Sequence, residues 1–324
     1  SGEYFGYVVT SKGVQHFEVP LPRESLANKI ATLTKSLSSR DLAFHAQSKE
    51  LYRLLIDPAA AALKGKKTLI VIPDASLWQL PFAALEDKQG RYLTEQLSVS
   101  YAPSLSVLAV LTKRAESRHA SAGLYAIGNP SMPNGATDQP AIPQTEAEVR
   151  SIGGFFDVAH RVVRTGVAAS ESSFKAQSGD KAVVHLATHG ILNSTSPLDS
   201  EILLAADDKE DGHLSAREIM QLDLNADLVV LSACEMANGR VGAGEGLIGM
   251  SWALFVAGSP STVANLWKTD ASASGSLMVD FHRELKSGAT KSDALRQAML
   301  ATMKKPEFRH PFYWAGFELI GNPF

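Results

Sequence analysis

Cys234 and His189 are the residues whose types and spacing could together carry out nucleophilic chemistry. Cys234 is the only cysteine in the 324 residues, and His189 precedes it by 45 positions. A thiol becomes a strong nucleophile when a neighbouring imidazole takes its proton or stabilises the thiolate. Gly190 follows the histidine directly, and the backbone amides of Gly190 and Cys234 are candidates for an oxyanion hole. The pair therefore predicts acyl transfer through a covalent intermediate.

His185 is a second histidine on the same segment, four residues before His189. Alternation along a strand puts both side chains on one face. Because His189 stands at the end of the apolar run and His185 inside it, we expect His189 to be the base and His185 to be a buried supporting residue. One cysteine and two histidines on one strand do not make a closed ligand set, so neither a metal nor a cofactor is predicted.

Two apolar segments must position this pair. Residues 181–190 (KAVVHLATHG) and 227–239 (DLVVLSACEMANG) each predict a buried strand that leads to the reactive side chain. If the two strands are parallel neighbours, both side chains emerge at the carboxyl edge of the sheet, where open α/β folds place their ligand sites. The segment 238–246 contains four glycines, which suits a loop that passes close to a substrate main chain.

The remainder of the chain predicts the scaffold around these strands. From residue 123 onward strands and helices alternate, which indicates a largely parallel sheet. Residues 246–257 are expected to form a helix. The loop 131–143 holds three prolines and Gly135 and is expected to be mobile.

The first third of the chain predicts a different arrangement. Residues 1–20 alternate as a hairpin that turns at Lys12 and Gly13, residues 24–64 have helical spacing, and residues 67–74 read as a buried strand. The polar segment 112–123 is the expected boundary between this region and the rest.

The composition excludes several classes of function. The chain has 45% hydrophobic and 20% charged residues, which is ordinary for a globular protein, and its formal net charge is −3. That charge gives no electrostatic footprint for nucleic acid or an anionic membrane. The longest apolar stretch, 246–258, is too short to span a bilayer. Since the opening residues do not form a signal peptide and a single cysteine needs no oxidising compartment, a cytoplasmic location is predicted.

The ordered motifs resemble a known family, the CHAT domains, which are caspase-like domains associated with TPR repeats. The resemblance covers residues 67–324 and extends through this family to the caspases and separases. The matching segments are PDASLWQLPFAAL, YLTEQLSVSYAPSLSVL, VVHLATHG, LSAREIMQLDLNADLVVLSACEMANG, GEGLIGMSWALFVAGSPSTVANLW and HPFYWAGFELIG.

The resemblance implies a fold, a reaction and partners. The fold is α/β, with a caspase-like, mostly parallel sheet flanked by helices over residues 119–324 and a smaller degenerate caspase-like half over residues 1–118. His189 carries over as the base and Cys234 as the nucleophile of a cysteine endopeptidase. The implied partner is a protein or peptide substrate, which for some bacterial members is a gasdermin-like effector in defence or regulated proteolysis. A TPR or other recognition module is implied in the parent protein.

The first specificity pocket holds the substrate residue before the scissile bond. In the caspase fold the residue two before the nucleophile lines it, and here that residue is Ser232. Separases, which prefer arginine, carry an aspartate eight residues after the tryptophan that matches Trp267, where this chain has Gly275. Both positions are uncharged, so we expect a neutral or apolar residue before the scissile bond. The nearest acids, which could bind a basic side chain or simply cap helices and face solvent, are Asp199, Glu245 and Asp270.

Two other functions stay open beside the endopeptidase. The same fold could serve as a catalytically silent scaffold that binds a partner, although both catalytic positions are intact. A Cys–His hydrolase that acts on small amides would need a tight pocket in place of an open groove.

Overall fold

An eight-stranded sheet organises the chain. The computed structural model describes residues 4–117, 123–136, 139–191, 193, 195–232, 240–242 and 246–324. In spatial order the strands are β3 (Thr68–Val71), β4 (Ser98–Tyr101), β15 (Phe317–Gly321), β14 (Ser261–Asn265), β11 (Leu228–Leu231), β7 (Val183–Ala187), β5 (Leu124–Pro130) and β6 (Arg161–Gly166).

The strand directions divide this sheet into two parallel groups. Strands β14, β11, β7, β5 and β6 run parallel to one another. Strands β3, β4 and β15 form the second parallel group, and the groups meet at the antiparallel pair β14 and β15. The prediction of a mostly parallel sheet is confirmed, and β7 and β11 meet the stated condition of being parallel neighbours.

Burial follows the position of each strand in the sheet. The four residues of β11 are all buried, as expected for a continuous apolar run in a parallel sheet covered on both faces. The strand predicted at residues 67–74 is present as β3, but its predicted burial is wrong, because β3 is an edge strand and its four residues are only half-buried.

Helices flank the sheet. They are α1 (Arg23–Ser38), α2 (Phe44–Leu55), α3 (Ala60–Leu63), α4 (Leu93–Gln96), α5 (Leu105–Glu116), α6 (Pro143–Gly153), α7 (Glu171–Gln177), α8 (Ala216–Ile219), α9 (Met250–Ala257), α10 (Ala271–Lys286) and α11 (Lys291–Met303). Helix α10 packs between α6 and α11. It does so through an apolar stripe at helical spacing that consists of Ala273, Leu277, Met278 and Phe281.

Smaller sheets complete the molecule. They pair β1 (Tyr4–Thr10) with β2 (Gly13–Val19), β9 (Glu201–Leu203) with both β8 (Gly190–Ile191) and β10 (His213–Ser215), and β12 (Arg240–Gly242) with β13 (Gly246–Ile248). The predicted N-terminal hairpin is confirmed. The predicted helix over residues 246–257 begins only at Met250, because residues 246–248 pair with β12.

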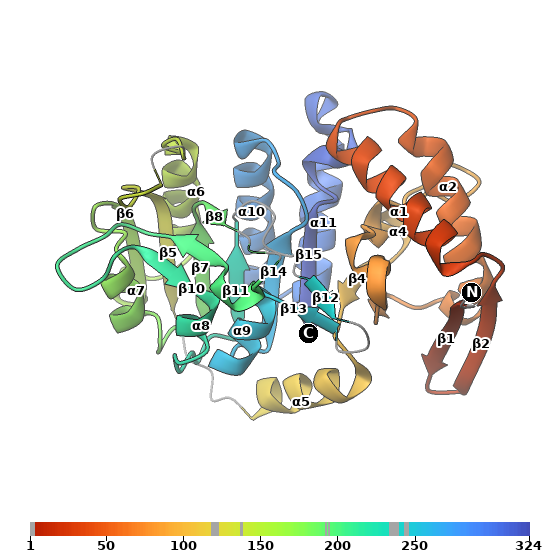
Figure 1. Cartoon of the computed structure of the whole chain (residues 1–324), viewed down its shortest axis with the longest axis horizontal. Helices are drawn as coiled ribbons and strands as arrows, with labels where there is room; N and C mark the ends of the chain where they lie inside the picture. Colours follow the sequence, from red (N-terminus) through yellow and green to blue (C-terminus); the bar gives the residue numbers. More distant parts are fainter. Residues whose placement is uncertain are drawn as a thin grey trace.

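The N-terminal region lies at one end of the large sheet. Figure 1 shows α1, α2 and the β1–β2 hairpin at the same end of the molecule as β4, with β6 and α7 at the opposite end. Strands β3 and β4 precede residue 118 yet belong to the same sheet as β14 and β11. The proposed division into residues 1–118 and 119–324 stays a prediction, and residues 118–122 lie outside the described part of the chain. None of the described helices is long and apolar enough to cross a membrane.

Candidate active site

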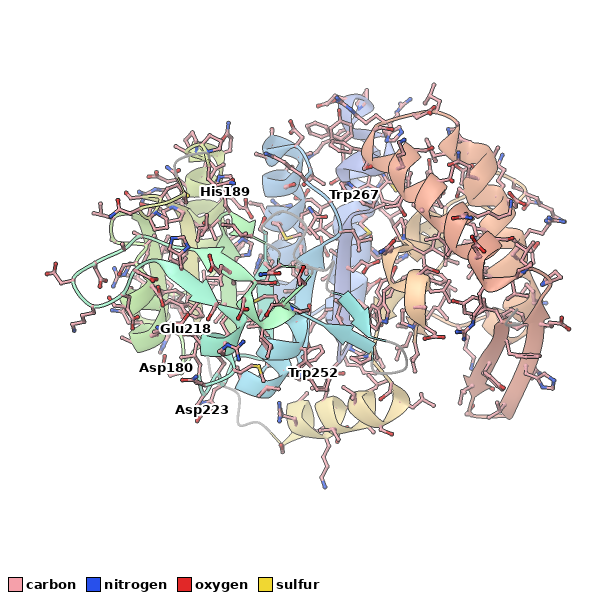
Figure 2. All side chains as sticks on the ribbon, viewed as in Figure 1. Asp180, His189, Glu218, Asp223, Trp252 and Trp267 are labelled. Atoms are coloured by element: carbon pink, nitrogen blue, oxygen red, sulfur yellow. The ribbon has the colours of Figure 1, made fainter. Side chains whose placement is uncertain are left out.

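His189 lies just beyond the carboxyl end of β7, between that strand and β8 (Figure 2). Its side chain is buried, and its Nε2 atom is 2.8 Å from the carbonyl oxygen of Pro140. A carbonyl oxygen can only accept a hydrogen bond, so Nε2 carries the proton. In the neutral ring the lone pair is then on Nδ1, which fixes the nitrogen that can act as a base.

The connection between β5 and α6 places the Pro140 carbonyl. Asn129 adopts a left-handed backbone conformation with φ of 46°. Its Oδ1 atom accepts a hydrogen bond from the amide of Ile142 at 3.0 Å, and its own amide donates to Thr145 Oγ1 at 2.8 Å. These bonds close the base of the loop that was expected to be mobile. The described part of that loop is therefore held in place next to His189.

The end of β11 lies beside β7, as the predicted pair requires. Leu231 is in register with Leu186, and the amide of Ser232 donates to the Leu186 carbonyl at 2.9 Å. Ser232 is half-buried. Cys234 itself lies outside the described residues, as does Glu245. Ser232, the last described residue of this segment, thus lies two positions before the predicted nucleophile.

Gly190 presents its backbone amide away from the neighbouring strand. The amide of Leu203 donates to the His189 carbonyl at 2.9 Å, so His189 and Leu203 form a hydrogen-bonded pair of the antiparallel ladder. The next pair, Gly190 with Ile202, is then non-hydrogen-bonded, and its N–H groups point outward from the ladder. This orientation leaves the Gly190 amide directed away from β9.

His185, on β7 and four residues before His189, belongs to a buried polar cluster. Its Nε2 atom is 2.8 Å from Glu148 Oε1 on α6, and its Nδ1 atom is 3.1 Å from His282 Nε2 on α10. All three side chains are buried. Burial, with a smaller contribution from His185, holds the pKa of His282 well below its usual value. The cluster ties β7 to both helices on this face of the sheet.

The candidate substrate-binding acids that the structure describes already have partners. Asp270 caps α10, and its Oδ1 atom accepts from the amides of Ser272 and Ala273 at 3.0 and 2.9 Å. Asp199 forms an ion pair with Arg217 at 2.9 Å. Hydrogen bonds from Ser196 and Arg217 lower the pKa of the Asp199 carboxyl group.

Gly275, at the position where separases carry an aspartate, lies on α10 against Glu148. A Cβ atom there would be 3.4 Å from Glu148 Oε2, at the short end of ordinary van der Waals contact. The sequence did not point to this neighbourhood, because Glu148 is 127 positions away from Gly275 along the chain.

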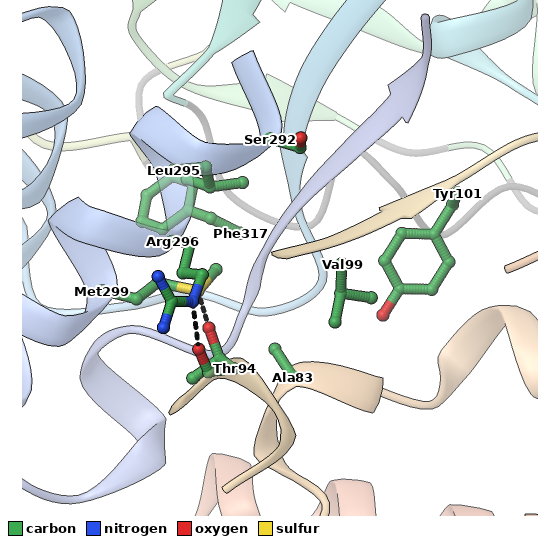
Figure 3. Close-up of a pocket in the computed structure, with 9 residues that line it drawn as sticks. All are labelled: Ala83, Thr94, Val99, Tyr101, Ser292, Leu295, Arg296, Met299 and Phe317. Carbon is green, nitrogen blue, oxygen red and sulfur yellow. Dashed lines mark hydrogen bonds between the residues drawn. The ribbon is translucent and has the colours of Figure 1, made fainter. Parts of the chain in front are cut away.

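Two other features of the described residues resemble ligand sites, but their geometry does not suit a ligand. The three carboxylates of Glu171, Glu210 and Glu218 converge, but the ammonium group of Lys175 lies 2.7 to 3.0 Å from each of them. Figure 3 shows a hollow between α11 and β4, where Arg296 donates to the Thr94 carbonyl at 2.7 Å. Its volume of about 10 Å³ holds no more than one water molecule.

Sequence reasoning missed the residues that position His189. Pro140 acts through its backbone carbonyl, which leaves no mark in the residue type. Asn129 was overlooked because it stands at the boundary between a predicted strand and the following loop, although an Asn before a Pro is a signal for a turn.

Known proteins resemble the chain at two levels. The CHAT domain family model matches residues 45–322. Tetratricopeptide repeat protein 28 of Homo sapiens is 28% identical over 340 residues, which cover 89% of this chain and 14% of the human protein. The chain thus spans a small part of that relative.

Solved structures share the fold at low sequence identity. Saccharomyces cerevisiae separase, in its complex with securin, gives a TM-score of 0.57 at 12% identity, over 96% of this chain and 21% of that one. The Arg-specific cysteine proteinase gingipain R of Porphyromonas gingivalis gives a TM-score of 0.50 at 9% identity, over 93% of this chain and 74% of that one. Because the family model covers most of the sequence, the chain belongs to the CHAT domain family, and its similarity to these neighbours gives it the fold of caspase-like cysteine peptidases.

Proposed function

We propose that this domain is a cysteine endopeptidase that works through Cys234 and His189. The observation that carries the proposal is the hydrogen bond that His189 Nε2–H donates to the Pro140 carbonyl, which leaves the lone pair of the neutral ring on Nδ1. Strand β7, which leads to His189, pairs with β11, which leads to Cys234. A base that is oriented by a third group is a recurring feature of activated nucleophiles.

The reaction follows from these roles. His189 Nδ1 takes the thiol proton, and the sulfur of Cys234 attacks the scissile carbonyl carbon. The amides of Gly190 and Cys234 donate to the oxyanion, for which the outward orientation of the Gly190 amide is suitable. The leaving amine then takes the proton from His189, and water hydrolyses the thioester after giving a proton to the same nitrogen. Because the thiol must stay reduced, we place the reaction in a reducing compartment such as the cytoplasm.

The substrate side of the proposal is a peptide with a neutral or apolar residue before the cut. Ser232 is uncharged, and the described candidate acids Asp199 and Asp270 are engaged with Arg217 and with the start of α10. Since the human relative is a tetratricopeptide repeat protein, we expect the parent protein to present such substrates through a repeat module.

The test is peptide hydrolysis by Cys234→Ala, His189→Ala and the double variant. Each single change should abolish turnover with the fold intact, and the double variant should be hardly worse, because the two residues act as one unit. His160→Gln, which changes an exposed histidine in another part of the fold, is the matched control and should keep full activity. Substantial turnover in Cys234→Ala would overturn the peptidase assignment, and a wild type without turnover on any peptide would favour a scaffold.

A further inference from the structure

We propose that His213 is a positioning residue, which latches the connection between β5 and α6 next to the catalytic pair when its ring carries both protons. The inference rests on the proposed peptidase function, because the effect of His213 reaches the reaction only through His189.

The hydrogen bonds of His213 require a doubly protonated ring. Its Nδ1 atom is 2.8 Å from Glu201 Oε2 on β9, and its Nε2 atom is 3.1 Å from the carbonyl oxygen of Asn134. A carbonyl oxygen and an ionised carboxylate only accept hydrogen bonds, so both ring nitrogens must donate. A neutral ring has a single N–H group and would lose one of the two bonds.

A second contact holds the loop 131–136 against the hairpin of β9 and β10. Gly212, with φ of +85°, precedes His213, and a Cβ atom on it would be 2.8 Å from Pro133 Cβ. Pro133 is buried. Only a glycine allows the loop to approach this closely, so the contacts of Pro133 and Asn134 form one continuous attachment.

Two segments connect the contacts of Pro133 and Asn134 to the candidate site. Asn134 and Pro140 lie in the same connection, whose far end is held by the hydrogen bond between Asn129 and Ile142. On the other side, β9 carries Glu201 and pairs with β8, which begins at Gly190. The latch therefore joins the segment that orients His189 to the sheet that presents the candidate oxyanion amide.

The charges around His213 set the direction of its response to pH. Glu201 faces it from β9, and Asp211 in the preceding turn accepts its backbone amide at 2.9 Å. Glu171 of α7 accepts the neighbouring Gly212 amide at 2.9 Å, and residues 131–136 carry no charge.

Burial opposes the charged ring, but the hydrogen bonds of Glu201 and Asn134 raise the pKa of His213 above its usual 6.5. The fold in which His213 bonds to both Glu201 and Asn134 favours the charged ring, so both hydrogen bonds of the latch are present below that raised pKa. The latch is lost as the pH rises through that value.

The experiment compares wild type with His213→Gln across pH. A Gln side chain does not titrate, so its contacts are the same at every pH. We expect the wild-type kcat to exceed that of His213→Gln about tenfold at pH 6, the contribution of one hydrogen bond to a charged group, and the ratio to approach one at pH 8.5. KM should change little, because the base is displaced and the substrate groove is not. Glu201→Gln should move the step to lower pH, and His160→Gln is the matched control.

A measurement independent of turnover separates this proposal from the peptidase assignment. Nitrogen NMR of the ring at pH 6 should show the neutral form of His189 protonated at Nε2 in the wild type and as a mixture of tautomers in His213→Gln. If that change occurs but neither protein hydrolyses peptides, the latch stands and the peptidase function fails. If hydrolysis depends on Cys234 and His189 while the kcat ratio and the His189 tautomer do not respond to His213→Gln, the latch is overturned.

Discussion

His189 and His185 share a strand and a face but differ in what surrounds them. Within the described part of the chain, the ring of His189 has one hydrogen-bond partner, the Pro140 carbonyl, which leaves Nδ1 for the proposed chemistry. His185 uses both nitrogens on Glu148 and His282 and has none left for a substrate. At the scale of single residues, the number of ring nitrogens that already have hydrogen-bond partners distinguishes His189, the proposed base, from His185, the supporting residue.

The first prediction at this scale ranks the two histidines. His189→Gln should lower kcat by about 100- to 10 000-fold, the usual range for the loss of a general base, with little effect on stability. His185→Gln should lower kcat by about tenfold at most. It should reduce the free energy of unfolding by about 1–3 kcal/mol, because two buried partners lose a hydrogen bond. Steady-state kinetics and denaturant unfolding of both variants provide the check, and the reverse order of rates would identify His185 as the base.

At the scale of elements, the start of α10 decides what Asp270 can do. The helix begins at Ala271, and the Asp270 side chain accepts hydrogen bonds from two amides of its first turn. A carboxylate at this position also interacts favourably with the positive end of the helix dipole. These interactions favour a structural role over the recognition of a basic substrate side chain.

The corresponding prediction uses a conservative pair of substitutions. Asp270→Asn keeps a side-chain acceptor and should retain stability, whereas Asp270→Ala should cost about 1 kcal/mol of unfolding free energy. In a library of peptides varied before the scissile bond, wild type and Asp270→Asn should share a preference for neutral or apolar residues. A preference for arginine or lysine that disappears in Asp270→Asn would instead identify Asp270 as the specificity residue.

At the scale of the whole molecule, the seam between β14 and β15 joins the two parallel groups of strands. Glu318 lies in this seam, in register with Ala264, and its side chain is buried. Burial raises the pKa of the Glu318 carboxyl group well above its usual 4.5. The folded protein therefore holds a proton here that the unfolded chain releases, so stability should fall as the pH rises from 4.5 towards the raised value.

Removing this proton linkage should flatten the pH dependence of stability. Glu318→Gln should raise the free energy of unfolding relative to wild type by about 1.4 kcal/mol for each pH unit above 4.5 within that window. At pH 4.5 the two proteins should be equally stable. Chemical denaturation between pH 4.5 and 8 tests this, with the exposed Glu24→Gln as control. Parallel curves for wild type and Glu318→Gln would show that the seam does not hold a proton.

Much of the scaffold could be predicted because it depends on local pattern. The apolar runs of β7 and β11 indicate buried parallel strands, and His189 stands where the first of them ends. The capping box of Ser215 and Glu218 at the start of α8 follows the same kind of local spacing, three residues apart. Local pattern predicted the burial of β3 incorrectly, because burial depends on the position of a strand within the sheet, and that position is set by distant strands.

The sequence by itself determined the fold class, the family and the order of the two residues proposed for catalysis, since these depend on periodicity and on residue type. Only the tertiary structure decided which atoms meet: Pro140 reaches His189 across 49 positions, and Asn134 reaches His213 across 79. In both pairs the acceptor is a backbone carbonyl, which every residue possesses, so no residue type marks it in advance. Its role depends on how the chain brings distant segments together, and that is a property of the folded molecule alone.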